Sequence, residues 1–266
     1  MNKVMNNDNN IVAQLLDGVH CMDNCDGMML LPRECIDLVV TSPPYDDLRT
    51  YGGHSWDFYG VAWNLKRVLK PGGVIVWVVS DATKDGSETG TSMEQALHFK
   101  RLGLNLHDTM IYASDRPPLN SNRYEHAFEY MFVISKGSPK TVNKIRTKSI
   151  NGGKANTSRR YYRVDGSVKE MSKPGTYNDD KVLPNIWWYA TGLEKTGHPA
   201  VYPITLANDH IASWSNKGEI VLDPFMGSGT TAKAAKDLGR HYIGFEINQE
   251  YVDICNMRTA QNALNI

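Results

Sequence analysis

Short apolar runs alternate with helical patterns along most of this chain, and this alternation limits the possible folds more than any other feature. Residues 36–42 and 74–79 are rich in β-branched side chains and indicate buried strands, whereas residues 58–70 place apolar side chains at helical spacing. Strands that alternate with helices favour parallel pairing. We therefore predict an α/β fold with a doubly wound, mostly parallel sheet. Further strands are expected over 104–113, 126–135, 219–223 and 241–246, and further helices over 93–102, within 202–215 and 227–239, and at the C-terminus.

A basic, glycine-dotted segment interrupts the alternation. Residues 136–173 contain eleven lysines and arginines but only two acids, Asp165 and Glu170. The alternation resumes after about residue 184. We therefore divide the chain into residues 1–135, an insertion over 136–184, and residues 185–266, with the first and last segments forming one α/β domain.

The overall composition excludes little. The 29 basic and 29 acidic residues cancel, so net charge does not indicate a partner. The four cysteines fit neither a disulfide framework nor a zinc-binding spacing, and we interpret them as reduced thiols with no metal. The sequence shows no signal peptide and no apolar run of the roughly 20 residues that a membrane span needs. We expect a cytoplasmic protein.

A glycine-rich turn, "VLDPFMGSGTT", lies between a predicted strand and a predicted helix. In doubly wound sheets such a turn lies at the carboxyl edge, where ligands bind. About twenty residues after Gly227 the next strand ends in Glu246, which can accept hydrogen bonds from a ribose. The third glycine of a dinucleotide fingerprint and the lysine of a Walker loop are both missing. An amino acid joined to adenosine fits better, with Asp223 on its ammonium and turn N–H groups on its carboxylate, and this predicts S-adenosyl-L-methionine as cofactor.

The stretch "TSPPY", residues 41–45, ends the first buried strand with two prolines. Two prolines fix two φ angles and remove two N–H donors, so they hold a rigid extended turn with its carbonyls in place. Alone, such a stretch is as easily a simple turn. The presence of the glycine turn in the same chain favours a functional role for Ser42 and Tyr45.

Together, Ser42-Pro43-Pro44-Tyr45 and "DPFMGSGTT" resemble the motifs of the β-class, or permuted, DNA amino-methyltransferases, which methylate cytosine N4 or adenine N6. In that class the catalytic motif comes first, a target-recognition region follows, and the cofactor motif comes last. The resemblance implies a Rossmann-like methyltransferase fold in which residues 1–135 are the catalytic half and 185–266 the cofactor half. The lead-in "LLDGVHCMDNCDGMMLLPRECIDLVV", residues 15–40, and "KTGHPAVYP", residues 195–203, are also similar to family segments. The implied cofactor-binding residues are Asp17, Thr41, His198, Pro199, Asp223, Pro224, Phe225, Gly227, Ser228, Gly229, Thr230, Glu246 and Asn248.

The expected chemistry is methyl transfer to an exocyclic amino nitrogen. Ser42 Oγ and the Pro43 carbonyl are candidates to accept hydrogen bonds from that nitrogen and to stabilise its developing positive charge. Tyr45 is expected to stack on the base, which must be flipped out of the duplex. The catalytic residues implied are Ser42, Pro43, Pro44 and Tyr45. Asp81, Glu125 and Glu129 are interpreted as structural.

The insertion is interpreted as the DNA reader, because its location is where the family places target recognition and lysines and arginines neutralise phosphates. The alternative is a solvated basic loop. The expected DNA-binding residues are Lys144, Arg146, Lys148, Arg159, Arg160 and Arg163.

The target base, the class of function and the partners stay open at this point. Serine in the motif favours cytosine N4, with adenine N6 as the alternative. Enzymes with similar motifs also methylate RNA or protein, and a non-catalytic DNA-binding module is a third possibility. Double-stranded DNA is the expected partner, and a homodimer and a separately encoded restriction endonuclease are open partners.

Overall fold

The computed structural model describes residues 10–45, 56–114, 122–156, 160–170, 175–190 and 202–260. The chain divides into two compact units, one of residues 1–143 and 185–266 and the other of Lys144–Pro184. Residues 136–143 thus belong with the first unit, although the sequence placed them in the insertion. One reason is Lys136, whose ammonium group donates to the backbone oxygens of Lys66 and Leu69.

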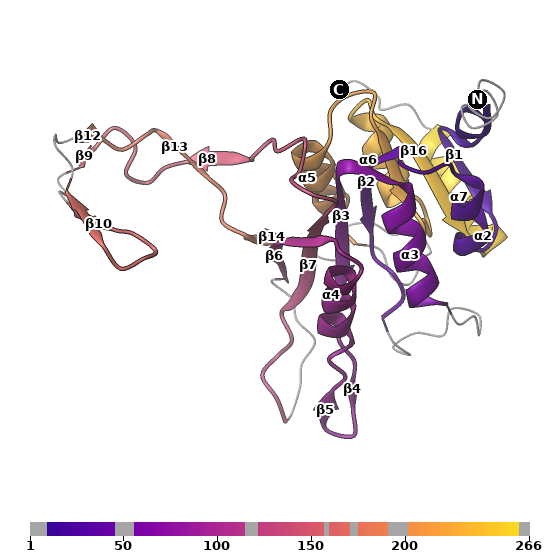
Figure 1. The fold of residues 1–266 in the computed structure, drawn as a ribbon, viewed down its shortest axis with the longest axis horizontal. Coiled ribbons are helices and arrows are strands. Elements are labelled where there is room, and N and C mark those ends of the chain that lie inside the picture. The colour runs from indigo at the N-terminus through magenta and orange to yellow at the C-terminus, as the bar shows by residue number, and fades with distance from the viewer. Residues whose placement is uncertain are drawn as a thin grey trace. The chain divides into compact units, whose positions relative to one another are not determined.

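The first unit is built on one large sheet, shown in Figure 1. Eight of the described strands pair in the order β1-β16-β15-β2-β3-β7-β6-β14. Every pairing is parallel except the two made by β7. The prediction of a doubly wound, mostly parallel sheet is therefore confirmed. The strands are β1 (Gly18–Cys21), β2 (Ile36–Thr41), β3 (Leu69–Val79), β6 (Asn105–Ser114), β7 (Phe128–Ser135), β14 (Ile186–Tyr189), β15 (Ile220–Asp223) and β16 (His241–Glu246).

Helices cover both faces of this sheet. The helices α2, α3 and α4 pack on one face, whereas α5, α6 and α7 pack together on the other. None of the described helices is long and apolar enough to cross a membrane. The helices are α2 (Asn24–Leu30), α3 (Phe58–Val68), α4 (Thr91–Arg101), α5 (Ile204–Trp214), α6 (Thr230–Asp237) and α7 (Gln249–Ala260), and a small hairpin of β4 (Thr83–Lys84) and β5 (Ser87–Glu88) precedes α4.

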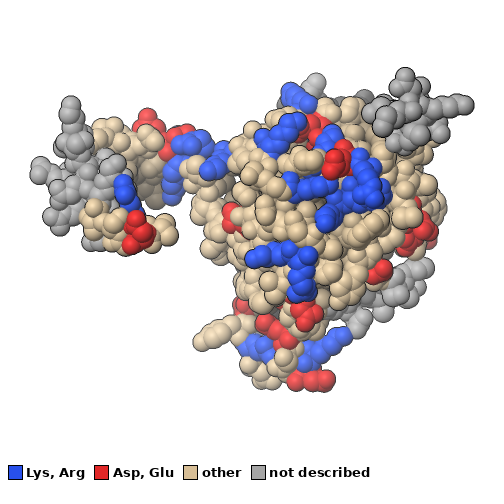
Figure 2. All heavy atoms as spheres, in the orientation of Figure 1, with Lys and Arg blue, Asp and Glu red and all other residues tan. Residues whose placement is uncertain are grey.

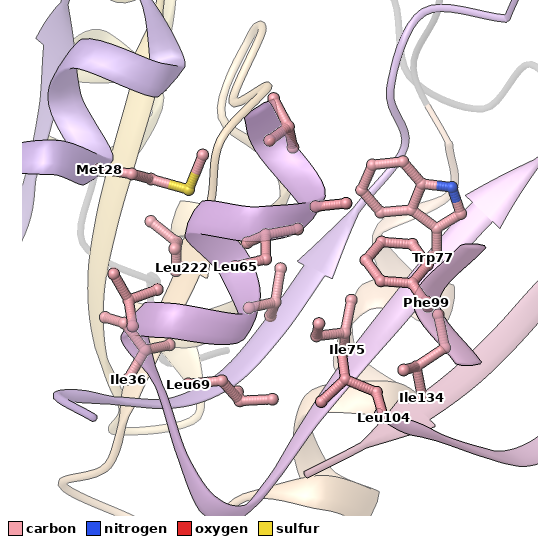
Figure 3. Packing of buried hydrophobic residues seen from close by; sticks show 14 of the residues in the cluster. Met28, Ile36, Leu65, Leu69, Ile75, Trp77, Phe99, Leu104, Ile134 and Leu222 are labelled. Atoms are coloured by element: carbon pink, nitrogen blue, oxygen red, sulfur yellow. The ribbon is translucent and has the colours of Figure 1, made fainter. Parts of the chain in front are cut away.

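The main core lies between the sheet and the helices α2, α3 and α4. Figure 3 shows Trp77 from β3 against Phe99 from α4, and their ring centroids are 5.3 Å apart in an edge-to-face arrangement. The Trp77 indole N–H donates to Gln95 Oε1 at 2.8 Å, so its polar atom is satisfied although the residue is fully buried. Leu222 from β15 belongs to the same cluster, which therefore supports the strands at the centre of the sheet.

The chain changes direction between β2 and β15. From β2 it continues through α3 to β3 on one side, and from β15 it continues through α6 to β16 on the other. Right-handed crossovers place these two helices on opposite faces. The carboxyl ends of β2 and β15 therefore border the crevice in which doubly wound sheets bind their ligands.

The second unit consists of short antiparallel strand pairs. Three pairs are described, and in one of them Lys148 lies opposite Asp180 and Arg146 opposite Val182. The sequence predicted no strands here, because strands of two or three residues in a polar, glycine-rich segment show no apolar period. The strands are β8 (Arg146–Lys148), β9 (Ala155–Asn156), β10 (Arg160–Tyr162), β11 (Val168–Glu170), β12 (Gly175–Thr176) and β13 (Asp180–Val182), paired β8–β13, β9–β12 and β10–β11.

Candidate active site

A buried hydrogen bond joins the two strand ends that border the crevice. The Thr41 hydroxyl, at the end of β2, donates to Asp223 Oδ1, at the end of β15, at 2.6 Å. The register Leu222 to Val39 brings these ends together. The "SPPY" and "DPFMGSG" stretches, about 180 residues apart in the sequence, therefore leave the same edge of the sheet from neighbouring strands.

The Asp223 carboxylate is held by three donors inside the protein. Besides Thr41, the Thr231 hydroxyl donates to Oδ2 at 2.6 Å and the Phe225 N–H donates to Oδ1 at 3.0 Å. Tyr202 contacts the Thr231 hydroxyl in turn. Burial raises the pKa of Asp223 to about 6, although the hydrogen bonds from Thr231, Thr41 and Phe225 lower it. Three of the roughly four acceptor positions of this carboxylate are filled. Its predicted bond to a cofactor ammonium stays a prediction.

The glycine turn that follows β15 needs glycine for both conformation and space. Gly227 and Gly229 have φ values of 52° and 86°, which side chains rarely adopt. A Cβ on Gly229 would lie 2.3 Å from Cys255 Sγ of α7. The turn is thus pressed against α7, and only a glycine fits there.

A carboxylate and an arginine hold this turn in place. Glu246, at the end of β16, accepts from the Gly227 N–H at 2.9 Å and from the Asn248 N–H at 2.9 Å, through different oxygens. Arg258 of α7 donates to the Ser228 carbonyl oxygen at 2.7 Å and contacts the Thr230 hydroxyl at 3.5 Å. Each Glu246 oxygen keeps one further acceptor position. Its predicted contact with a ribose stays a prediction.

The sequence predicted that N–H groups of this turn bind the cofactor carboxylate. The Gly227 and Phe225 N–H groups already donate to carboxylates of the protein, and the Gly229 N–H donates to the Met226 carbonyl oxygen. These three N–H groups are therefore engaged within the turn. Arg258 was not predicted, because one arginine in a C-terminal helix gives no signal in the sequence.

Aromatic rings line the start of the turn. Phe225 packs edge-to-face on Trp56, with ring centroids 5.0 Å apart. Both rings are partly buried against the main core, as is Tyr45. The turn after β15 and the motif after β2 therefore rest on the same apolar core. Pro224, at the start of the turn, is buried.

Ser42, Tyr45 and Glu129 form a chain of hydrogen bonds. Ser42 Oγ lies 2.8 Å from the Tyr45 hydroxyl oxygen, and the Tyr45 hydroxyl donates to Glu129 Oε2 at 2.7 Å. Pro43 is buried and Pro44 half-buried between them. Glu129 reaches this edge because β7 runs antiparallel and begins where β3 ends, with Tyr130 opposite Val79.

The structure corrects the expectation for Asp17. This residue precedes β1 and lies beside the start of β16, where its Oδ2 is 2.8 Å from His241 Nδ1. Glu246 is at the other end of β16, about 17 Å away for five steps of about 3.3 Å. Asp17 therefore lies at the amino edge of the sheet, opposite the crevice, and is removed from the candidate cofactor residues.

The acid at the carboxyl edge on this side is Asp23. It follows β1 and caps α2, accepting from the Cys25 N–H at 2.8 Å and the Asp26 N–H at 3.2 Å. Its neighbour Met22 donates its N–H to the Glu246 carbonyl oxygen at 3.0 Å. An Asp before a helical run is an N-cap signal that was available in the sequence.

The remaining predicted residues fall in three groups. Asn248 caps α7 by accepting from the Glu250 N–H at 2.9 Å. His198, Pro199 and Arg159 lie outside the described residues, as does the side chain of Arg160. Lys144, Arg146, Lys148 and Arg163 are exposed on the second unit. Among the described residues, no group of three or more His, Cys, Asp or Glu side chains is placed to hold a metal ion.

Acidic side chains partly neutralise the basic ones on the second unit. Arg146 forms a two-pronged ion pair with Asp180, with Nε–Oδ2 at 2.6 Å and Nη2–Oδ1 at 3.0 Å. This hydrogen bond raises the pKa of Arg146 and lowers that of Asp180. The face of this unit drawn in Figure 2 likewise shows red spheres among the blue ones. Arg146 must therefore leave Asp180, or share it, to contact a phosphate.

The fold and the carboxyl-edge site define a Rossmann-like methyltransferase. The DNA methylase family model, of the N6/N4 methyltransferases, matches residues 36–257. The chain belongs to this DNA methylase family, whose cofactor is S-adenosylmethionine.

Named relatives agree with this family. The chain is 52% identical over 233 residues to the orphan methyltransferase M.BamHII of Bacillus amyloliquefaciens, covering 84% of this chain and 88% of the relative. It is 28% identical over 255 residues to the type II methyltransferase M.BglII of Bacillus subtilis, covering 91% and 68%.

Solved structures show the same fold. The cytosine-N4-specific PvuII DNA methyltransferase superposes with a TM-score of 0.66 at 20% identity, covering 93% of this chain and 87% of that one. The complex of M1.HpyAVI with S-adenosylmethionine superposes with a TM-score of 0.63 at 23% identity, covering 91% and 98%.

Proposed function

We propose that this protein is a site-specific DNA methyltransferase that transfers a methyl group from S-adenosylmethionine to the exocyclic amino nitrogen of a flipped base. The observation that carries the proposal is the Thr41–Asp223 hydrogen bond. It ties the proposed amine-binding motif to the proposed cofactor turn at the crevice between β2 and β15. One site can therefore hold both reactants in line, which is the main requirement of a group transfer.

We assign the protein to the β-class arrangement. The motif at Ser42 precedes the turn at Gly227, and the basic second unit, Lys144–Pro184, comes between them. This order, with the resemblance of both motifs, supports the assignment.

When bound, S-adenosylmethionine supplies an electrophilic methyl group whose transfer leaves a neutral thioether. The proposed cofactor residues surround the turn. Glu246 offers its remaining acceptor positions to the ribose, and Phe225 and Trp56 offer apolar surface to the adenine. Thr41, Pro224, Ser228, Gly229, Thr230 and Asn248 shape the turn and its flanks, and Asp223 anchors it.

The proposed role of Ser42 is to accept a hydrogen bond from the amino group of the base. An exocyclic nitrogen is a weak nucleophile because its lone pair is conjugated with the ring. A fixed acceptor on its N–H favours a more pyramidal nitrogen and stabilises the positive charge that develops there. The Pro43 carbonyl is the second proposed acceptor, Pro44 keeps the turn stiff, and the ring of Tyr45 is proposed to stack on the base.

Cytosine N4 is the proposed target, and adenine N6 is the alternative. The argument is the neutral hydroxyl of Ser42, which is a weaker acceptor than the carboxylate found more often in adenine enzymes. An RNA or protein amino group is a third candidate. The molecule and the base that carry the label distinguish among these three.

We propose that the second unit reads double-stranded DNA through Lys144, Lys148, Arg159, Arg160 and Arg163, with Arg146 released from Asp180. A DNA substrate fits a cytoplasmic enzyme. The names of the relatives leave two alternatives for a restriction endonuclease, since one is a type II methyltransferase and the other an orphan. A homodimer remains a proposal that sedimentation can test.

The test is incubation with tritiated S-adenosylmethionine and mixed-sequence duplex DNA. We expect label in the DNA, and nucleoside digestion followed by mass spectrometry to identify N4-methylcytosine. N6-methyladenine would support the alternative base. Label in RNA or protein alone, or none anywhere with the cofactor bound, would refute a DNA methyltransferase.

A further inference from the structure

Resting on the proposed function, we propose that Glu129 is a positioning residue that fixes the direction of the Ser42 hydroxyl through Tyr45. The sequence interpretation treated Glu129 as structural. Its carboxylate instead takes the one proton of the Tyr45 hydroxyl, and this decides what Ser42 presents to the substrate amine.

The proton count along the chain supports this role. A carboxylate only accepts, so Tyr45 is the donor in its 2.7 Å bond to Glu129. A phenol has one proton, so in the 2.8 Å contact with Ser42 the donor is the serine hydroxyl. The Ser42 proton then points at Tyr45, and both lone pairs of Oγ are left as acceptors. Ser42 therefore meets an amino group as a pure acceptor.

Reversing the chain would oppose the proposed chemistry. If Tyr45 donated to Ser42, one Oγ lone pair would be occupied and the Ser42 proton would be released to point elsewhere. A proton aimed at the substrate nitrogen would compete for the lone pair that must attack the methyl group. Glu129 prevents this, because a group that only accepts makes one direction of the chain favourable.

The position of Glu129 suits a fixed partner. It lies on β7, a central strand between β3 and β6, and pairs with Tyr112 in the register of β6. Strand residues hold their side chains more firmly than loop residues do. Ser42 and Tyr45 follow β2 directly, and the hydrogen bond to Glu129 ties them to a second strand of the sheet.

A double-mutant cycle tests the proposal. Glu129→Gln keeps the size of the side chain but adds an N–H₂ that can donate to Tyr45 and reverse the chain. Tyr45→Phe keeps the ring and removes the hydroxyl. We expect Glu129→Gln to lower the single-turnover methylation rate by about 10- to 100-fold. This is the usual effect of losing a residue that orients, through a hydrogen bond, a side chain in contact with the reacting centre. The Kd for S-adenosylmethionine and the KM for DNA should stay within twofold of wild type.

The decisive comparison is made in the Tyr45→Phe background. If Glu129 acts only through the Tyr45 hydroxyl, adding Glu129→Gln to Tyr45→Phe should change the rate by less than twofold. The inference would be overturned if the rate loss of the double variant equalled the product of the two single losses. An unchanged rate in Glu129→Gln alone would overturn it as well. Glu125→Gln, which alters an exposed acid just before β7, is the matched control.

Two further outcomes are separated by design. If wild type does not methylate DNA at all, the proposed function fails. If wild type methylates DNA but Glu129 and Tyr45 show no coupling, only the role of Glu129 is refuted. Thermal unfolding is measured for each variant. If Glu129→Gln does not fold, the same cycle with Glu129→Asp, which keeps an acceptor-only group, decides by the same criterion of coupling to Tyr45.

Discussion

Thr41 and Asp223 are joined at 2.6 Å across the carboxyl ends of two neighbouring strands, although 182 positions separate them in the sequence. The bond is buried, and the aspartate that accepts it is 1% exposed. It therefore fixes the distance between the motif after β2 and the turn after β15. Four predictions follow from the contacts around these two strand ends and from the second unit.

The first prediction concerns the pH dependence of stability. Burial raises the pKa of Asp223 from 3.8 to about 6, so between these values the folded protein binds a proton that the unfolded chain has lost. The contribution of Asp223 to the free energy of unfolding should therefore fall as pH rises from about 4 to about 6, by up to about 3 kcal/mol. Asp223→Asn should flatten this fall.

Urea unfolding at pH 4, 5, 6 and 7 measures the slope for both proteins. Asp253→Asn, which removes an exposed carboxylate from α7, is the control. A parallel pH profile in wild type and Asp223→Asn would show that Asp223 does not titrate in this window.

The second prediction concerns packing of the glycine turn. Gly229→Ala adds a Cβ that would lie 2.3 Å from Cys255 Sγ, in addition to the strain of φ +86°. We expect a loss of about 2–4 kcal/mol in the free energy of unfolding, because overpacking and a left-handed backbone each cost about 1–2 kcal/mol or more.

Gly218→Ala separates the two causes. Gly218 has a similar φ of +79° with nothing within 4 Å of an added Cβ, so this variant should show the backbone cost alone. Chemical denaturation of the two variants is compared with wild type. Equal losses would mean that the clash with Cys255 is relieved by a shift of α7.

The third prediction concerns cofactor binding through Glu246. Its two oxygens accept the N–H groups of Gly227 and Asn248, and Glu246→Gln replaces one acceptor with a donor. The turn should loosen and the ribose should lose an acceptor. We expect the Kd for S-adenosylmethionine to rise by about 10- to 100-fold, since each lost hydrogen bond to a charged group costs about 1.5–3 kcal/mol.

Isothermal titration calorimetry measures this Kd. Glu250→Gln, in the first turn of α7, changes an exposed acid and is the control. A Glu246→Gln protein that binds the cofactor as tightly as wild type would remove Glu246 from the cofactor site.

The fourth prediction concerns DNA binding by the second unit. Lys148 is exposed on β8, and each phosphate that a lysine neutralises contributes about −0.9 to the slope of log K against log salt concentration. Lys148→Gln should therefore make that slope less steep by about 0.9. The measurement is fluorescence anisotropy on one duplex at several salt concentrations.

The control is Lys217→Gln, which alters an exposed lysine of the first unit near Gly239, at the amino end of β15. Its salt slope should equal that of wild type. If both variants keep the wild-type slope, Lys148 makes no phosphate contact and the basic reader must use other residues of the second unit.

The sequence alone determined the fold class and the chemical family. Apolar runs that alternate with helical spacing predicted most strands of the sheet, because buried parallel strands and amphipathic helices must show these periods. It missed β1 and β14, because these strands bury few side chains and so show no apolar run, unlike β15 of the same length. It also missed α2, whose seven residues are too few to show a helical period. The glycine turn at Gly227, with Asp223 before it and Glu246 at the end of the next strand, predicted the cofactor, because glycines impose backbone shapes that are local properties.

Tertiary structure alone decided which side chains meet. The strand β1 lies between Asp17 and Asp23 and runs parallel to β16, so Asp17 lies at the amino edge of the sheet and Asp23 at the carboxyl edge. The reversed direction of β7 brought Glu129 to Tyr45, and α7 brought Arg258 to the glycine turn. These contacts depend on which strands are neighbours and in which direction they run, and long-range packing sets both.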